Sequence, residues 1–273
     1  MVVPPASWPW ALLPIAALCA VDPSGLAPFG PAKWALVPTL VLLGFAALAH
    51  EGRLRLDGAR ALAAFVAWTA VCAAFGLDGL YAWTGTPERH FGVITWALVL
   101  LCWWAGRSLD AHARRIVLIA CTIAIGAAGG WAGAEVLGWE PLRLVGVGDR
   151  PVGPLGSSAF LAAAAVLLTP IALGQTMQSR GWARVAAAAT AGLGLTALAA
   201  SGARAAILAS VVVAVIVVVM HRDRRVLAVV GACALVGVGV VVASGAAHRV
   251  SSLASDRNGG ARGRLDEWRV AAR

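Results

Sequence analysis

Residues 185–220 read VAAAATAGLGLTALAASGARAAILASVVVAVIVVVM, two apolar stretches that are joined by the short turn SGAR at 201–204. The stretches, 185–203 and 205–220, approach the ~20 apolar residues that a helix needs to cross a bilayer. Arg204 is the one charge between them, so it is expected at or below the membrane surface. The pattern predicts two membrane helices that meet at this arginine.

Similar runs without Asp, Glu, Lys or Arg recur along the whole chain. With 60% hydrophobic and only 13% charged residues, a soluble core of this size would lack the polar surface to cover itself. We predict an all-α, polytopic bundle of about nine transmembrane helices in residues 1–247, followed by the start of a large extracytoplasmic loop at 248–273. The predicted helices cover residues 8–21, 34–49, 61–77, 91–106, 116–134, 157–174, 185–203, 205–220 and 226–247.

The first run contains Pro9 and Pro14 but has no basic segment before it, so we favour a membrane helix over a removed signal peptide.

The distribution of basic residues predicts that the N-terminus lies inside and the C-terminal tail outside, because inner loops retain positive charge. With this orientation the inner loops hold 11 basic residues and the outer loops five, while the remaining six lie in the tail from Arg249 to Arg273. The inner set is Arg53, Arg55, Arg60, Arg107, Arg114, Arg115, Arg180, Arg184, Arg222, Arg224 and Arg225, and the outer set is Lys33, Arg89, Arg143, Arg150 and Arg204.

About half of the net charge of +9 is therefore topological and the rest is confined to the outer loops and the tail, so no soluble basic domain is expected to bind nucleic acid. The five cysteines lie within apolar runs at no metal-like or disulfide-like spacing and are interpreted as small buried hydrophobes. No metal and no cofactor are predicted. Six tryptophans near helix ends fit an aromatic belt at the membrane surface: Trp8, Trp10, Trp34, Trp83, Trp139 and Trp182.

Four glycines at 126–133 form two overlapping patterns of small residues four apart, Gly126 with Gly130 and Gly129 with Gly133. Small residues at this spacing allow two helices to approach closely. We therefore expect this segment to pack tightly against another helix.

Three places on the outer side carry candidate chemistry, and the first is the segment 141–158. Arg150 is followed by glycines and serines that lead into a new helix, where exposed backbone N–H groups could hold an anion. A plain loop with turn residues and a serine N-cap explains the same residues.

Arg204 is the second place. An always-charged guanidinium at the membrane rim suits bidentate binding of a phosphate or diphosphate. The alternative is an arginine that extends to the lipid headgroups.

The tail is the third place. Arg264 and Trp268 are four residues apart and would share one face of a helix. A basic segment that lies on the membrane surface is the alternative.

Together these segments resemble the O-antigen ligase and polymerase superfamily of integral membrane proteins. The resemblance rests on RPVGPLGSSAF at 150–160, on SGARAAIL at 201–208 and on GRLDEWRVA at 263–271. The second is similar to the serine-arginine-glycine turn of the family, and the third to its pattern of arginine, three residues and tryptophan.

The resemblance implies a bacterial inner-membrane, multi-pass glycosyltransferase. It would move a glycan from a polyprenyl-diphosphate carrier to an acceptor hydroxyl on a lipid or protein, on the extracytoplasmic side and in contact with membrane lipid. Arg204, Arg264, Arg150 and Trp268 would bind the substrate. The general-base histidine of the family is expected beyond residue 273, which would make this chain an incomplete protein that is inactive alone. A transporter or channel-like protein for a small anion and a membrane scaffold are the alternatives.

Overall fold

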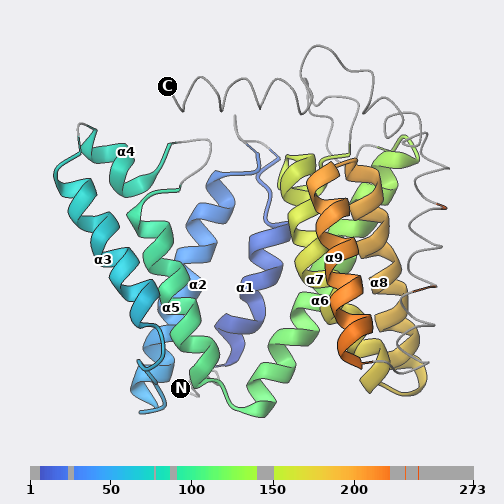
Figure 1. Cartoon of the computed structure of the whole chain (residues 1–273), viewed down its shortest axis with the longest axis horizontal. Helices are drawn as coiled ribbons and strands as arrows, with labels where there is room; N and C mark the ends of the chain where they lie inside the picture. The colour runs from blue at the N-terminus through green and yellow to red at the C-terminus, as the bar shows by residue number, and fades with distance from the viewer. Residues whose placement is uncertain are drawn as a thin grey trace.

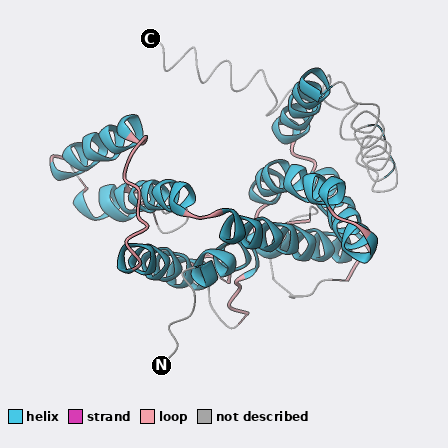
Figure 2. Ribbon diagram, turned by 90° about the horizontal axis from the view of Figure 1, so that it is seen from below, coloured by secondary structure: helices cyan, strands magenta, loops and turns pink. Residues whose placement is uncertain are grey.

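The structure is a computed structural model that describes residues 7–23, 28–76, 78–86, 91–139 and 151–221, with the single positions 231 and 239. Within these ranges the chain forms α-helices and one 3-10 turn and has no strand (Figures 1 and 2), so the predicted all-α class is confirmed there. The elements are α1 (Ser7–Cys19), α2 (Pro31–His50), α3 (Arg60–Ala74), α4 (Gly79–Thr84), α5 (Val93–Ser108), α6 (Ala111–Val136), η1 (Gly153–Leu155), α7 (Ser158–Gln178), α8 (Gly181–Ser201) and α9 (Arg204–His221).

Eight of the nine predicted apolar runs coincide with these helices. The ninth, 226–247, and the loop at 248–273 lie outside the described residues apart from two isolated positions. The short helix α4 was not predicted. It begins after Asp78, whose side chain accepts a hydrogen bond from the backbone N–H of Tyr81 at 3.3 Å, and it ends at Gly85 with a positive φ of 80°.

Four helices are long and apolar enough to cross a membrane, namely α2, α6, α7 and α8. Helix α1 has 13 residues, α3 has 15 and α5 has 16. At 1.5 Å per residue, even the longest of these three falls short of a hydrocarbon core of ~30 Å. The structure therefore supports four candidate spans in the described residues, and the total of nine remains a prediction.

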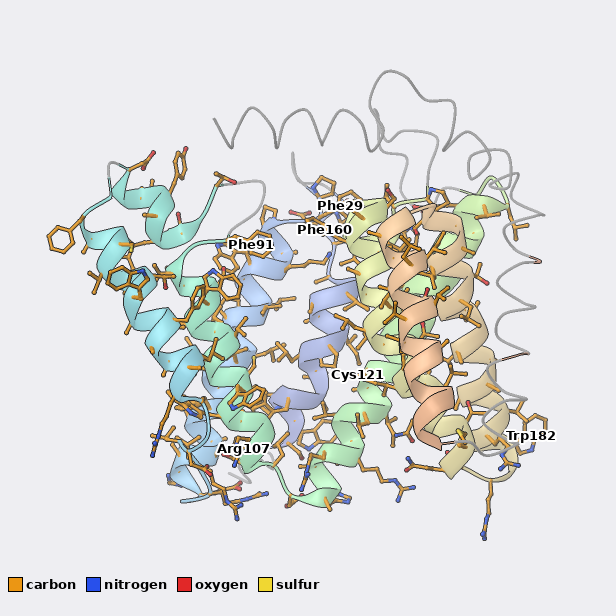
Figure 3. The ribbon with its side chains drawn as sticks, viewed as in Figure 1. Phe29, Phe91, Arg107, Cys121, Phe160 and Trp182 are labelled. Carbon is orange, nitrogen blue, oxygen red and sulfur yellow. The ribbon has the colours of Figure 1, made fainter. Side chains whose placement is uncertain are left out.

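Successive long helices run in opposite directions, so the connecting segments gather at two ends of the bundle (Figure 1). The segments 51–60, 107–115 and 179–184 form what we term the basic end. The segments 20–23, 28–33, 151–158 and 201–204 lie at the other end, which we term the turn end. Figure 3 labels Arg107 and Trp182 at the basic end, and Phe29 and Phe160 at the turn end.

Two apolar clusters make up the core, and α1 contacts both. The first is formed mainly by α6, α7 and α8 and includes Leu18 of α1. The second is formed by α2, α5 and the start of α6 and includes Trp10 of α1. Trp10 does not fit the predicted belt, because it is 4% exposed and its indole packs over Gly44, whereas Trp8 and Trp182 are exposed.

The glycine-rich segment of α6 packs against α8, as the sequence predicts. A Cβ added at Gly126 would lie 2.8 Å from the Thr190 methyl group, and one at Gly129 would overlap the carbonyl oxygen of Leu193. Gly133 also faces α8, whereas a Cβ at Gly130 would meet no atom within 4 Å. The contact face is thus 126, 129 and 133, and Gly130 lies outside it.

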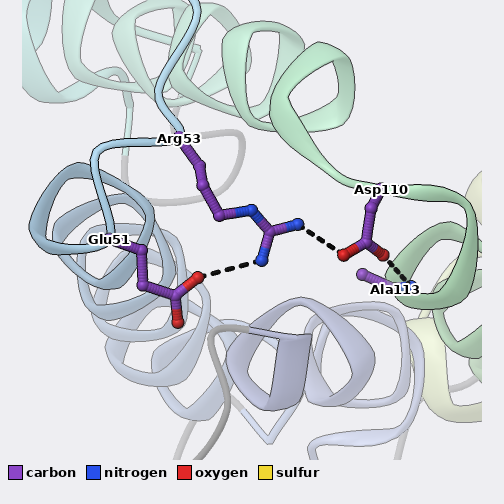
Figure 4. Close-up of polar contacts among 4 residues, drawn as sticks. All are labelled: Glu51, Arg53, Asp110 and Ala113. Atoms are coloured by element: carbon purple, nitrogen blue, oxygen red, sulfur yellow. Dashed lines mark hydrogen bonds and ion pairs between the residues drawn. The ribbon is translucent and has the colours of Figure 1, made fainter.

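Ion pairs connect the helix ends at the basic end (Figure 4). Arg53 contacts Glu51 at 2.9 Å and Asp110 at 2.7 Å, and the Asp110 carboxylate also accepts the backbone N–H of Ala113 at 2.7 Å. The hydrogen bond from Ala113 to Asp110 is an N-cap, which satisfies an otherwise unpaired N–H group in the first turn of α6. A third ion pair joins Arg107 to Asp57 at 2.9 Å. These contacts link the 51–60 segment to the α5–α6 corner.

The Asp110 contacts predict a pH-dependent contribution to stability. The hydrogen bond from Ala113, together with Arg53, holds the pKa of Asp110 below its ordinary value. A lowered folded-state pKa stabilises the protein above the unfolded value of about 3.9, and this stabilisation is lost as pH falls through the folded value. Asp110→Asn keeps an N-cap acceptor but removes the charge. We expect its Tm in detergent to lie slightly below wild type at neutral pH, with the difference closing as pH falls below the unfolded value of about 3.9 and through the lowered folded-state pKa. A difference that is independent of pH would contradict the assignment.

Candidate functional site at the turn end

Arg204 is the first residue of α9, directly after the turn that closes α8. Gly202 ends α8 with a positive φ of 59°, a conformation that glycine adopts without steric cost. The buried Ser201 hydroxyl donates to the carbonyl of Leu198 at 2.7 Å and accepts the N–H of Ala203 at 3.3 Å. The predicted short turn, with a new helix that begins at Arg204, is confirmed for the backbone. The Arg204 side chain lies outside what the structure describes.

The segment 151–158 leads into α7, as the sequence predicts. Residues Gly153–Leu155 form the turn η1, Gly156 follows with a positive φ of 69°, and Ser157 occupies the N-cap position of α7. The Ser157 side chain makes no capping hydrogen bond to the first turn of α7. Ser157 therefore occupies the N-cap position that the plain-loop explanation predicts, but its side chain does not form the predicted capping hydrogen bond. The anion-binding interpretation remains a prediction.

Glu135, in the last turn of α6, binds the backbone of this segment from one side. One carboxylate oxygen accepts the N–H groups of Val152 at 2.8 Å and Gly153 at 2.9 Å. The other accepts the indole N–H of Trp131 at 3.0 Å, one turn earlier in α6. Hydrogen bonds to an ionised acceptor are shorter and stronger than neutral ones. The carboxylate thus joins the end of α6 to the start of η1.

Lys33, in the first turn of α2, binds the same segment through its carbonyl groups. Its ammonium donates to the carbonyl of Pro154 at 2.6 Å and to that of Ala20, just after α1, at 2.8 Å. It also lies 5.9 Å from the centroid of the Phe29 ring, within the range of a cation–π contact. Lys33 therefore holds the end of α1, the start of α2 and η1 together.

We call Glu135 and Lys33 the η1 clamp. An anion holds N–H groups at 152 and 153, and a cation holds the carbonyl at 154, so each charge is matched to the backbone group that it can bind. Packing reinforces the clamp, because a Cβ added at Gly156 would overlap the Phe29 ring. The result is a fixed backbone at the point where the outer segment enters α7.

The two residues of the clamp were not among the predicted site residues. Lys33 was counted only as an outer charge, and Glu135 was not considered. A usable signal was present in both cases, since each is a lone charge at the edge of a long apolar run, as Arg204 is.

The other predicted site residues, Arg150, Arg264 and Trp268, lie outside the described residues. Across the part of the chain that is described, no group of three or more His, Cys, Asp or Glu side chains could hold a metal ion.

The fold and the site define a class of protein: a helical protein whose four long apolar helices suggest a membrane location. Comparison of the chain with protein-family models, with curated proteins and with solved structures finds no match. A specific function therefore has to be argued from the residues.

Proposed function

We propose that this chain belongs to a membrane glycosyltransferase of O-antigen ligase type, which transfers a glycan from a polyprenyl-diphosphate carrier to an acceptor hydroxyl. The observation that carries the proposal is the position of Arg204. It begins α9 at the turn end, where the clamped 151–158 segment also begins α7. Two of the three segments with family resemblance therefore lie at one end of the bundle.

We further propose that the turn end faces the extracytoplasmic side of a bacterial inner membrane. In the described residues the basic end holds eight arginines, whereas the turn end holds Lys33 and Arg204. This asymmetry follows the positive-inside rule, which orients the basic end toward the cytoplasm. The eight are Arg53, Arg55, Arg60, Arg107, Arg114, Arg115, Arg180 and Arg184.

In this proposal Arg204 binds the diphosphate of the carrier. Negative charge grows on the diphosphate as the bond to the anomeric carbon breaks, and a fixed cation stabilises that charge in the transition state. Arg150, Arg264 and Trp268 are proposed to complete the substrate site. The general base is proposed to come from a residue other than these, since none of the four accepts a proton readily at neutral pH.

Arg204→Ala, made in the protein as the cell produces it, tests the proposal. We expect glycan transfer to fall at least 100-fold, the order of loss seen when one preorganised charge-stabilising group is removed. Arg204→Lys should restore part of the activity, because lysine keeps the charge but not the bidentate geometry. The measurement is the ratio of carrier-linked to transferred glycan, with membrane insertion checked in parallel.

Arg60→Ala, an exposed arginine at the basic end, is the matched control and should transfer normally. Unchanged transfer in Arg204→Ala would overturn the role of this residue. An anion transporter would instead show solute uptake into liposomes that depends on Arg204, with no change in the carrier-linked glycan.

A further inference from the structure

The basic end carries more positive charge than its own acidic residues neutralise. Its described carboxylates are Glu51, Asp57 and Asp110, and each already contacts an arginine: Arg53 or Arg107. Six further arginines are exposed and form no ion pair within the part of the chain that the structure describes. They are Arg55, Arg60, Arg114, Arg115, Arg180 and Arg184.

The excess is clearest at the starts of two candidate membrane spans. Arg114 and Arg115 lie in the first turns of α6, and Arg180 and Arg184 flank the start of α8. The sequence contains no Asp or Glu between Asp149 and Asp223, so the α7–α8 corner has no acidic residue of its own. We call these four arginines the arginine set.

Apolar side chains lie beside these charges. Trp182 stands between Arg180 and Arg184 and is 87% exposed, and Met177, at the end of α7, is 42% exposed. Figure 3 shows Trp182 at the outer edge of the basic end. A tryptophan at the end of a span favours the headgroup level of a bilayer, where its ring contacts acyl chains and its N–H contacts water. A ligand for this surface therefore needs both an anionic group and an apolar tail.

We propose that the arginine set binds the phosphate headgroups of anionic phospholipids, one pair of arginines at the start of α6 and the other at the start of α8. Arginine is suited to phosphate because its planar guanidinium donates two parallel hydrogen bonds. Basic clusters at the ends of membrane helices attract anionic lipid, and the attraction weakens as salt increases. This surface lies at the opposite end from Arg204 and does not depend on the proposed glycosyl transfer.

Short-chain lipids titrated into the detergent-solubilised protein test the proposal. The probes are dioctanoyl phosphatidylglycerol, dioctanoyl phosphatidylcholine and inorganic phosphate, and binding is followed by the shift in thermal unfolding. We expect phosphatidylglycerol to bind roughly tenfold or more tightly than phosphatidylcholine, with the difference shrinking in high salt. The variant R114Q/R115Q/R180Q/R184Q should lose most of that preference, and the corresponding four-lysine variant should keep part of it.

The control is D57N/R107Q, which removes an ion pair at the same end without changing the net charge, and it should bind phosphatidylglycerol like wild type. If the four-glutamine variant does not fold, R180Q/R184Q alone and the salt titration of wild type give the same answer. Equal binding of both lipids, or an undiminished preference in the glutamine variants, would overturn the proposal. Binding of inorganic phosphate as tightly as phosphatidylglycerol would assign the surface to free phosphate instead of lipid.

Discussion

Replacing Gly129 by alanine is expected to lower the free energy of unfolding by about 1–3 kcal/mol, the usual cost of forcing an extra group into a packed core. The added Cβ would overlap the carbonyl oxygen of Leu193 and lie 3.0 Å from its Cβ. A backbone carbonyl cannot rotate away as a flexible side chain can, so α6 and α8 must move apart. Ile125, which a Cβ added at Gly194 of α8 would meet at 3.2 Å, belongs to the core formed by α6, α7 and α8, so the separation would also loosen the packing around it.

Gly130→Ala is the matched control, one residue further along the same helix. A Cβ there meets no atom within 4 Å, and alanine favours helix over glycine by up to ~1 kcal/mol. Gly126→Ala should fall between the two, because its Cβ would meet the movable Thr190 methyl group. The measurement is the Tm of each variant in detergent, which we expect to be lowest for Gly129→Ala, intermediate for Gly126→Ala and highest for Gly130→Ala. Equal melting of Gly129→Ala and Gly130→Ala would contradict the α6–α8 contact.

This glycine face also shows where sequence-based prediction of the fold reached its limit. Eight of the nine predicted apolar runs coincide with helices in the described residues, since a run without charge has few other ways to satisfy its backbone in a membrane. The spacing of the glycines indicated close packing, but only the partner helix decides which glycines are used. Gly130 belongs to one of the two predicted pairs and still faces away from α8. The short helix α4 was missed because six residues are too few to show a helical period.

The candidate site was predictable to a similar degree. The Arg204 turn and the start of α7 could be located because glycine, serine and a single charge interrupt apolar sequence. The η1 clamp could not, because Lys33 and Pro154 are 121 residues apart and the bond goes to a backbone carbonyl, which has no sequence signature. Trp10 was misplaced for a related reason, since nothing in its own segment indicates that Gly44 leaves room for its ring.

Breaking the η1 clamp is expected to free the backbone at 152–154. Glu135→Gln keeps the shape of the side chain but replaces a charged acceptor of two N–H groups by a neutral amide, and a hydrogen bond to a charged group contributes about 1.5–3 kcal/mol. Lys33→Met keeps the length but leaves the carbonyls of Ala20 and Pro154 without their donor. Hydrogen exchange at the amides of Val152 and Gly153 should accelerate roughly tenfold or more in Glu135→Gln, since ~1.4 kcal/mol corresponds to a factor of ten.

The two substitutions should also be coupled, because Glu135 holds residues 152 and 153 and Lys33 holds the next residue, 154, in the same turn. The double variant is then expected to be destabilised by less than the sum of the two single effects. A turn that one substitution has already released loses little further stability from the second. Glu51→Gln, an exposed carboxylate at the basic end, is the control and should leave exchange at 152–153 unchanged. Slow exchange at these amides in Glu135→Gln would mean that the turn is held by packing against Phe29 rather than by charge. In that case Gly156→Ala, whose Cβ would overlap the Phe29 ring, would be the substitution that releases the turn.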